Sequence, residues 1–296
     1  MTGRGIDHLV LCVRDLDLAR DTYARMGFTL TPRALHPFGT GNSLVQLDGC
    51  FLELLAVMEP ERIEDPVPGA FGFAAFNRDF LQAGEGFSML VFESSDADAD
   101  RREFADKGLS RLAPFDFQRS ARLPDGSDVT VGFSLTFVTH PEMPRAAFFT
   151  CQQHAPQYFW KPEYQRHANT ARTVAEVVMV AADPGRHAPL FAGLHGADAV
   201  TAGEDGLSIR TARGAIAVLT PPAWTARYGA IPHPGLGDGP RLAAYRIAVA
   251  DIAACSDCLA RGGFAGGQGG DRLVVPPDRA FGVLIEFAPV GEYGKA

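Results

Sequence analysis

The chain of 296 residues has little of several features that mark particular protein classes. No uninterrupted apolar run approaches the ~20 residues that a membrane-spanning helix needs, so we expect no membrane partner. Acidic residues outnumber basic ones by 35 to 27, which gives a formal net charge of −8, and no basic tract is present. We therefore expect neither nucleic acid nor an anionic membrane surface as a partner.

Cysteine is scarce and forms no framework. The five cysteines are an odd number, and the one C-x-x-C spacing, Cys255 and Cys258, lies in a predicted helix without the second pair that a zinc site needs. We interpret these two as small helix residues. The first predicted strand begins near residue 6, which leaves no room for a signal peptide. Reduced thiols and a cytoplasmic location are the expectation.

What the chain does contain is a repeated pattern of one strand, one helix and further strands. It recurs four times with a period of roughly 70–80 residues, which indicates an architecture of internal repeats. The leading strands are predicted over 6–13, 87–93, 174–181 and 241–249, and the helices over 16–26, 96–107, 185–194 and 252–261. Further strands are predicted over 28–32, 42–48, 50–57, 129–138, 145–151, 206–211, 214–220, 271–275 and 280–287.

One unit alone would leave a sheet face open, whereas two paired units can close a curved sheet around a cavity. The pattern therefore predicts an α+β protein of four βαβββ modules in two tandem domains, 1–165 and 170–296, with curved mixed sheets. Residues 158–171 are predicted to bridge the domains, and 221–240 and 262–270 to be loops. Pro124-Asp125-Gly126 predicts a tight turn.

Two polar residues interrupt otherwise apolar strands. His8 lies in the first strand, and Glu53 lies in the strand over 50–57. Burying either without a partner is costly, so each should be satisfied by hydrogen bonds or by a metal. One interpretation is a divalent metal site; the other is a core histidine paired with a buried carboxylate. Either way, the two would face one cavity.

Two further segments are candidate binding elements. Residues 148–169 combine aromatic rings, amides and histidines, a mixture typical of an apolar pocket with a few orienting groups. The alternative is an interdomain linker anchored by aromatic packing. Residues 36–42 carry two glycines in a polar loop, but no helix follows, so this is no phosphate loop and we expect no nucleotide cofactor. From these segments the predicted substrate-binding residues are His36, Asn42, Phe149, Gln152, Trp160, His167 and Asn169.

The chain resembles the vicinal oxygen chelate superfamily, in particular its glyoxalase-like branch. The resemblance is carried by the segments Gly5-Ile6-Asp7-His8-Leu9-Val10, Arg14-Asp15-Leu16, Met26-Gly27-Phe28, His36-Pro37-Phe38-Gly39-Thr40-Gly41-Asn42 and Phe51-Leu52-Glu53-Leu54-Leu55. It implies paired modules forming a concave sheet, with metal ligands from first and last strands. His8 matches a first-strand ligand and Glu53 a last-strand ligand.

The second module departs from that pattern. Its first strand offers Ser88 or Met89, and its last strand offers Thr150, Gln152, Gln153 or His154. The resemblance implies a metal held by His8, Glu53 and His154, with Fe, Mn, Zn, Ni and Mg not distinguishable. In the C-terminal half, Glu176 and Glu286 stand at comparable places, where a structural role is favoured over a second site.

We therefore expect an enzyme acting on a small molecule with vicinal oxygens, in which His8 and Glu53 are catalytic. Isomerase or lyase chemistry and extradiol-type dioxygenation both stay open; an iron dioxygenase would prefer two histidines and one carboxylate. The alternative is a metal-free protein of the same fold that sequesters an aromatic or hydrophobic ligand. A catalytically inert partner that forms a homodimer through sheet edges is a third interpretation.

Overall fold

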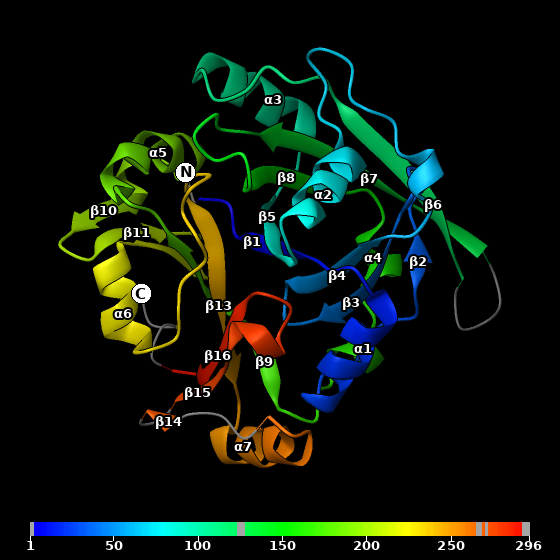
Figure 1. Cartoon of the computed structure of the whole chain (residues 1–296). Helices are drawn as coiled ribbons and strands as arrows, with labels where there is room; N and C mark the ends of the chain where they lie inside the picture. Colours follow the sequence, from blue (N-terminus) through cyan, green and yellow to red (C-terminus); the bar gives the residue numbers. More distant parts are fainter. Residues whose placement is uncertain (1–2, 123–127, 265–267, 270–271, 292–296) are drawn as a thin grey trace.

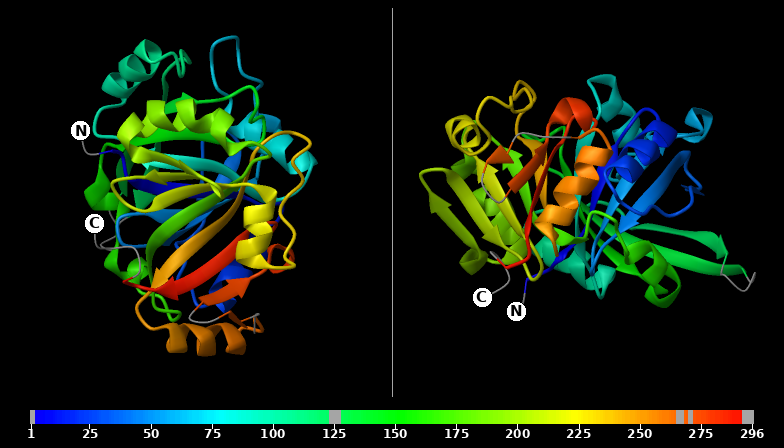
Figure 2. Two further views of the ribbon diagram at one scale, coloured as in Figure 1. Left: turned by 90° about the vertical axis from the view of Figure 1, so that its left-hand side faces the viewer. Right: turned by 90° about the horizontal axis from the view of Figure 1, so that it is seen from below.

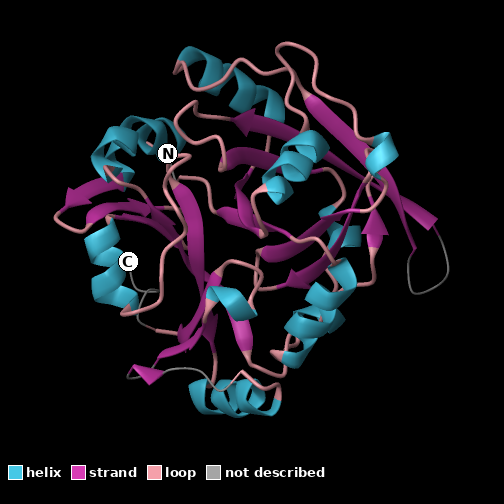
Figure 3. Ribbon diagram, viewed as in Figure 1, coloured by secondary structure: helices cyan, strands magenta, loops and turns pink. Residues whose placement is uncertain are grey.

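The computed structural model describes residues 3–122, 128–264, 268–269 and 272–291. The predicted turn Pro124-Asp125-Gly126 lies outside the described residues. Two curved sheets of eight strands each dominate the molecule (Figure 1), and the helices lie around them (Figure 3). This confirms the predicted α+β class. None of the helices in the described ranges combines the length and the apolar character needed to cross a membrane.

The first sheet has the strand order β2-β3-β4-β1-β5-β8-β7-β6. Its strands β1 and β5 are antiparallel, while β1–β4 and β5–β8 are parallel pairs, so each module contributes half of a mixed sheet. The strands are β1 (Ile6–Cys12), β2 (Ala34–Leu35), β3 (Thr40–Gln46), β4 (Phe51–Val57), β5 (Gly86–Glu93), β6 (Phe115–Arg122), β7 (Asp128–Val138) and β8 (Ala147–Gln153).

The second sheet repeats this order as β10-β11-β12-β9-β13-β16-β15-β14, again with an antiparallel central pair, β9 and β13. The two views of Figure 2 show the sheets as separate layers of one body. The strands of the second sheet are β9 (Ala171–Val180), β10 (Val200–Gly203), β11 (Gly206–Arg210), β12 (Ala215–Leu219), β13 (Arg241–Val249), β14 (Gln268–Gly269), β15 (Arg272–Val275) and β16 (Leu284–Pro289).

The module helices begin at the same signal in three of the four units. Asp15, Asp96 and Asp251 each accept a hydrogen bond from the backbone N–H three residues on, which caps the helix N-terminus. The seven helices in the described part of the chain are α1 (Leu16–Arg25), α2 (Phe73–Gln82), α3 (Ala97–Asp106), α4 (Pro156–Phe159), α5 (Ala188–His195), α6 (Pro221–Tyr228) and α7 (Ile252–Arg261). The helices predicted over 16–26, 96–107 and 252–261 are therefore confirmed.

One apolar core joins the two sheets. It contains buried residues from the convex faces of both, with α1 and α7 packed beside them. The Tyr23 and Tyr245 hydroxyl groups, one from each half, are 2.8 Å apart, and the Phe28 and Phe287 ring centroids are 6.0 Å apart. The division into domains 1–165 and 170–296 stays a prediction, because this core does not stop at the bridge.

Several local predictions were wrong. Residues 28–32 form no strand, and the loop predicted over 221–240 begins with the helix α6. Helix α2 and strand β6 were not predicted. Strand β14 falls within the loop predicted over 262–270, part of which lies outside the described residues. Helices α2 and α6 matter for function, because each packs on the concave face of one sheet.

Candidate functional site

The concave face of the first sheet encloses a chamber of about 40 Å³. Seven phenylalanines line it, together with a small polar set: His8, His36, Asn42, Glu53 and Arg119. A groove of about 820 Å³ adjoins it and shares Asn42, Leu44, Arg119 and Phe159 with the chamber wall. An apolar cavity with a few convergent polar groups is the usual form of a small-molecule site.

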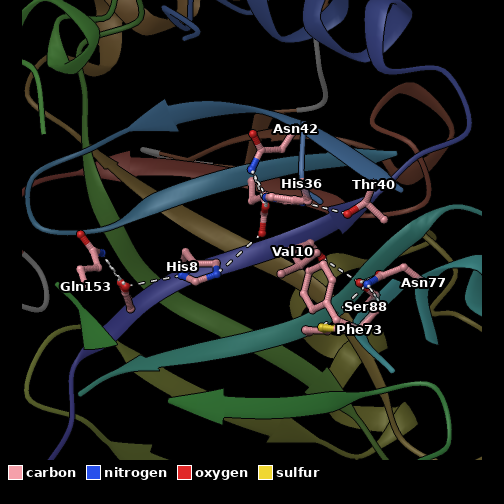
Figure 4. A network of polar contacts seen from close by, with 12 residues as sticks. His8, Val10, His36, Thr40, Asn42, Phe73, Asn77, Ser88 and Gln153 are labelled. Carbon is pink, nitrogen blue, oxygen red and sulfur yellow. Dashed lines mark hydrogen bonds and ion pairs between the residues drawn. The ribbon is translucent and has the colours of Figure 1, made fainter. Parts of the chain in front are cut away.

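Glu53 is the central anion of the chamber. It projects from β4 and is 5% exposed. Asn42, on the neighbouring strand β3, donates its amide N–H to Glu53 Oε1 over 2.6 Å. His8 Nε2 lies 3.7 Å from Oε2, and His36 Nε2 lies 3.8 Å from Oε1. The carboxylate is thus held on one oxygen, while its other oxygen faces His8. Figure 4 shows the contacts around His8, His36 and Asn42.

His8 lies between two carboxylates. Its ring stacks on Phe51 with the centroids 4.2 Å apart, which fixes the plane of the imidazole. Its Nδ1 is 3.4 Å from Asp7 Oδ2, and Gln153 donates to both oxygens of Asp7 over 3.2 and 3.3 Å. The pairing of β1 with β5 shifts its register between Ile6 and His8. This shift lets the Asp7 carboxylate reach Gln153 while it stays close to the His8 ring. Both Asp7 and His8 are buried.

His36 is a neutral member of the same network. Burial lowers its pKa to about 4, although the nearby charge of Glu53 opposes that shift. Its Nε2 accepts from the Asn42 amide at 3.2 Å, so its Nδ1 carries the proton and donates to Thr40 Oγ1 over 2.8 Å. The Asn42 amide nitrogen therefore donates to both His36 and Glu53, and each hydrogen bond from Glu53 to Thr40 has a defined donor and acceptor.

The structure brings some of the predicted residues together and separates others. His8, His36, Asn42, Glu53 and Phe149 line the chamber. Gln152 does not, because its amide accepts from the Ala97 backbone and donates to the Ser95 carbonyl on the other face of β8. Trp160 packs against Phe51 at 5.9 Å behind the chamber wall.

His154 also lies outside the chamber. It is exposed, and its Nε2 is 2.8 Å from Ser134 Oγ. His167 accepts from the Thr29 backbone N–H and donates to the Gln46 carbonyl. Asn169 donates to the Met26 carbonyl and accepts from the Ala171 N–H. These two residues anchor the bridge between the sheets, as the linker alternative for 148–169 had it.

The chamber residues do not fit a chelating metal site. On β5 the chamber side carries Met89 and Val91, and on β8 it carries Phe149 and Cys151. Ser88 Oγ is bound to Asn77 Oδ1 of helix α2 over 2.8 Å. His36 Nε2 is already engaged by the Asn42 amide, so His8 and Glu53 are left as two ligands, and the predicted set with His154 is not brought together.

Elsewhere, one group of side chains in the described part of the chain is compact enough for a metal. The ligand atoms of His140, Glu142 and His187 all lie within 4.8 Å of one another. This group lies between the β7–β8 loop and the start of α5 rather than in the chamber. Arg186 is paired with Glu142.

Within the described residues, ion pairs and a helix fill the concave face of the second sheet. Arg246 is 2% exposed and contacts Glu176 at 3.3 Å and Glu286 at 3.0 Å. Arg227 of α6 also pairs with both glutamates, and Tyr228 donates to Glu286. Guanidinium groups thus stand between the two carboxylates that sequence analysis had assigned a structural role.

Sequence analysis does not identify Arg119, Asp7 or the contact between Gln153 and Asp7. Phe115, Phe117 and Arg119 alternate with the exposed Asp116, Gln118 and Ser120, so a period of two was available as a signal for a half-buried strand. The sequence carries no such signal for Asp7, because only the register shift of β1 brings its carboxylate to the His8 ring.

Comparison with known proteins agrees with the fold. No curated protein matches the chain. A hypothetical protein from Staphylococcus aureus is similar over 97% of this chain and 100% of its own, with a TM-score of 0.67 and 13% identity. A triple mutant of 4-hydroxymandelate synthase from Streptomyces coelicolor is similar over 98% of this chain and 95% of its own, with a TM-score of 0.55 and 11% identity.

A fusion protein of a xylose isomerase-like TIM barrel and a 4-hydroxyphenylpyruvate dioxygenase is similar over 99% of this chain and 50% of its own, with a TM-score of 0.51 and 13% identity. At these identities the likeness shows the fold alone. The model of the glyoxalase-like domain matches residues 6–195, from the first strand through α5. The chain therefore belongs to the glyoxalase-like domain family.

Proposed function

We propose that this protein is an enzyme that moves a proton at a carbon atom beside neighbouring oxygens of a small molecule, as an isomerase or lyase does. The observation that carries the proposal is a buried array in which His8 and Glu53 line the chamber and Asp7 lies against the far nitrogen of His8. A base and an acid of different chemistry, held a few ångströms apart in an apolar cavity, are what proton transfer requires.

Glu53 is the proposed general base. Asn42 holds its Oε1, so Oε2 is the oxygen directed at a ligand that lies beside Glu53 and His8. Oε2 would take a proton from the substrate carbon, and the electron pair of the C–H bond would form the C=C bond of an enolate. The carbonyl oxygen would then carry the negative charge. In an α-hydroxycarbonyl compound, transfer of the hydroxyl proton to the former carbonyl oxygen, with return of the Glu53 proton to the adjacent carbon, completes an isomerisation. Where the carbon next to the enolate carries a leaving group, breaking that bond with its electron pair completes an elimination.

His8 is the proposed acid that stabilises the enolate oxygen. Asp7 Oδ2 lies 3.4 Å from Nδ1, so in a doubly protonated ring Nδ1–H would donate to Asp7 and Nε2–H would point into the chamber. Because Nε2 and Oε2 are only 3.7 Å apart, a substrate would lie beside the pair, with its oxygen at Nε2 and its C–H bond at Oε2. Stacking on Phe51 holds the ring in place before the substrate binds.

This chemistry draws on protein groups alone. With His36 Nε2 engaged by Asn42, His8 and Glu53 supply two metal ligands, fewer than the three that catalytic metal sites use. The rival function is sequestration of an apolar ligand, which the phenylalanine lining of the chamber favours. Turnover distinguishes the two functions.

The test is exchange of carbon-bound hydrogen with deuterated solvent, followed by NMR on hydroxyacetone, glycolaldehyde and 3-phenyllactate. Glu53→Gln keeps the size of the side chain and the Asn42 contact but removes the base. We expect exchange in the wild type and a loss of at least about 100-fold in the variant, because general bases contribute on the order of 100- to 10,000-fold. Asp116→Asn, on the exposed face of β6, is the matched control.

Unchanged exchange in folded Glu53→Gln would refute the role of Glu53. No exchange with any compound, together with binding that Glu53→Gln leaves intact, would favour sequestration. Circular dichroism on each variant separates a chemical effect from loss of the fold.

A further inference from the structure

Arg119 occupies the junction between the chamber and the groove. It lines both, and it projects from β6 on the same face as Phe115 and Phe117. Across the strand pair it is registered with Val131, and Phe117 is registered with Phe133. The Phe117 and Phe133 rings stack at 5.1 Å, so the guanidinium adjoins an aromatic wall.

No carboxylate among the described residues forms an ion pair with Arg119. Burial lowers the pKa of its guanidinium, and only the more distant charge of Glu53 raises it. The side chain nevertheless stays charged, because arginine is not deprotonated in proteins. Two other partly buried arginines are each neutralised directly: Arg4 by Asp100 and Glu103, and Arg227 by Glu176.

A half-buried cation without a counter-ion at the mouth of a cavity is costly unless a ligand supplies the anion. The chamber itself contains the carboxylate of Glu53, which would repel an anionic ligand if no cation stood beside the entrance. Lys161 and Arg33 line only the outer groove, and Arg33 is paired with Asp17. Arg119 is thus the cation placed to offset the charge of Glu53 for an incoming anion.

We propose that Arg119 binds the carboxylate of an organic acid and thereby selects acids over neutral substrates. The inference rests on the proposed function, whose substrate class it names. The chamber of about 40 Å³ admits a small oxygen-bearing head, and the groove of about 820 Å³ takes a larger remainder. A guanidinium presents a planar fork that matches a carboxylate through two parallel hydrogen bonds.

Calorimetric titration with matched acid and amide pairs tests the proposal. The probes are 3-phenyllactate with 3-phenyllactamide, and lactate with lactamide, which differ in charge but hardly in shape. Phenyl phosphate serves as the probe for phosphate. We expect the wild type to bind at least one acid about tenfold or more tightly than its amide, because charged hydrogen-bonded pairs are stronger than neutral ones. Phenyl phosphate should bind more weakly than the acid.

The variants locate this preference. Arg119→Gln should abolish it, and Arg119→Lys should retain part of it. Arg111→Gln removes the same charge from an exposed position and should leave it intact. Glu53→Gln should tighten the acid and leave the amide unchanged, because it removes a nearby negative charge.

Equal affinity for acid and amide in both pairs would overturn the proposal, and so would a preference that survives in Arg119→Gln. An equal loss in Arg111→Gln, or tighter binding of phenyl phosphate, would do the same. Failure of the proposed function is distinguishable: an acid preference that depends on Arg119, with hydrogen exchange unaffected by Glu53→Gln, leaves this inference standing and removes the proton-transfer role.

Discussion

Replacing Arg246 by methionine tests whether the ion-pair cluster holds the second sheet together. Arg246 on β13 is registered with Glu176 on β9 and with Glu286 on β16, so one guanidinium ties three adjacent strands. It is 2% exposed, and Glu286 is 1% exposed. Methionine keeps the apolar part of the volume but removes the charge.

Breaking a buried ion pair by removing one partner costs about 3–5 kcal/mol, because an uncompensated charge is left behind. Arg227 still contacts both glutamates, and Arg272 lies 3.5 Å from Glu286. We therefore expect the lower end, about 3 kcal/mol. Adding Glu286→Gln to Arg246→Met removes a buried carboxylate that has lost its Arg246 partner. The double variant should recover at least about 1 kcal/mol of the free energy of unfolding, because residues in contact are energetically coupled.

The chain offers a local probe for this measurement. Of its two tryptophans, Trp224 lies buried in α6 over the second sheet, and Trp160 lies beside the first. In a Trp160→Phe background, urea unfolding followed by fluorescence reports the surroundings of Trp224. A loss below about 1 kcal/mol for Arg246→Met, or strict additivity in the double variant, would refute the stabilising role of the cluster.

Three further outcomes are expected. Burial would raise the pKa of Glu286, but Arg227 and Arg246 together lower it. The stabilising contribution of this carboxylate is therefore complete above the unfolded pKa of about 4.3 and is lost as pH falls through the lower folded value. In acid unfolding followed by Trp224 fluorescence, stability should depend less on pH in Glu286→Gln than in the wild type. Elemental analysis of the wild type and His8→Ala should give the same metal content, and a near-stoichiometric metal lost in His8→Ala would contradict our interpretation of the chamber. Gly206→Ala should lower the free energy of unfolding by about 2 kcal/mol or more, since its Cβ would lie 1.9 Å from the Val218 carbonyl oxygen at φ +133; Gly203→Ala, with no atom within 4 Å, is the control in the neighbouring strand, and equal stability of the two would refute the steric argument.

The module pattern could be predicted from local signals. Asp15, Asp96 and Asp251 are N-caps that are legible in sequence, and the strands that follow are apolar. Helix α6 is the exception, because Pro221 and Pro222 are typical of a loop and the prediction over 221–240 rests on them. Proline is in fact well placed in the first turn of a helix, and Thr220 caps this one by accepting from the Ala223 N–H.

The site could be predicted only in part. His8 and Glu53 were found because each interrupts an apolar strand. The prediction for Gln152 was wrong because side chains alternate between the two faces of β8. Phe149 and Cys151 face the chamber, so Gln152 faces the other way. His154 follows the strand, and only the tertiary structure shows that it contacts Ser134.

The continuous core between the two convex faces has a consequence for cutting the chain. The bridge near Arg166 is exposed, so a protease could hydrolyse it. Each fragment would still cover the apolar back of the other, with Tyr23 and Tyr245 hydrogen-bonded across the seam. A nicked molecule should therefore stay associated without a peptide bond, whereas either half produced alone would expose that face and aggregate.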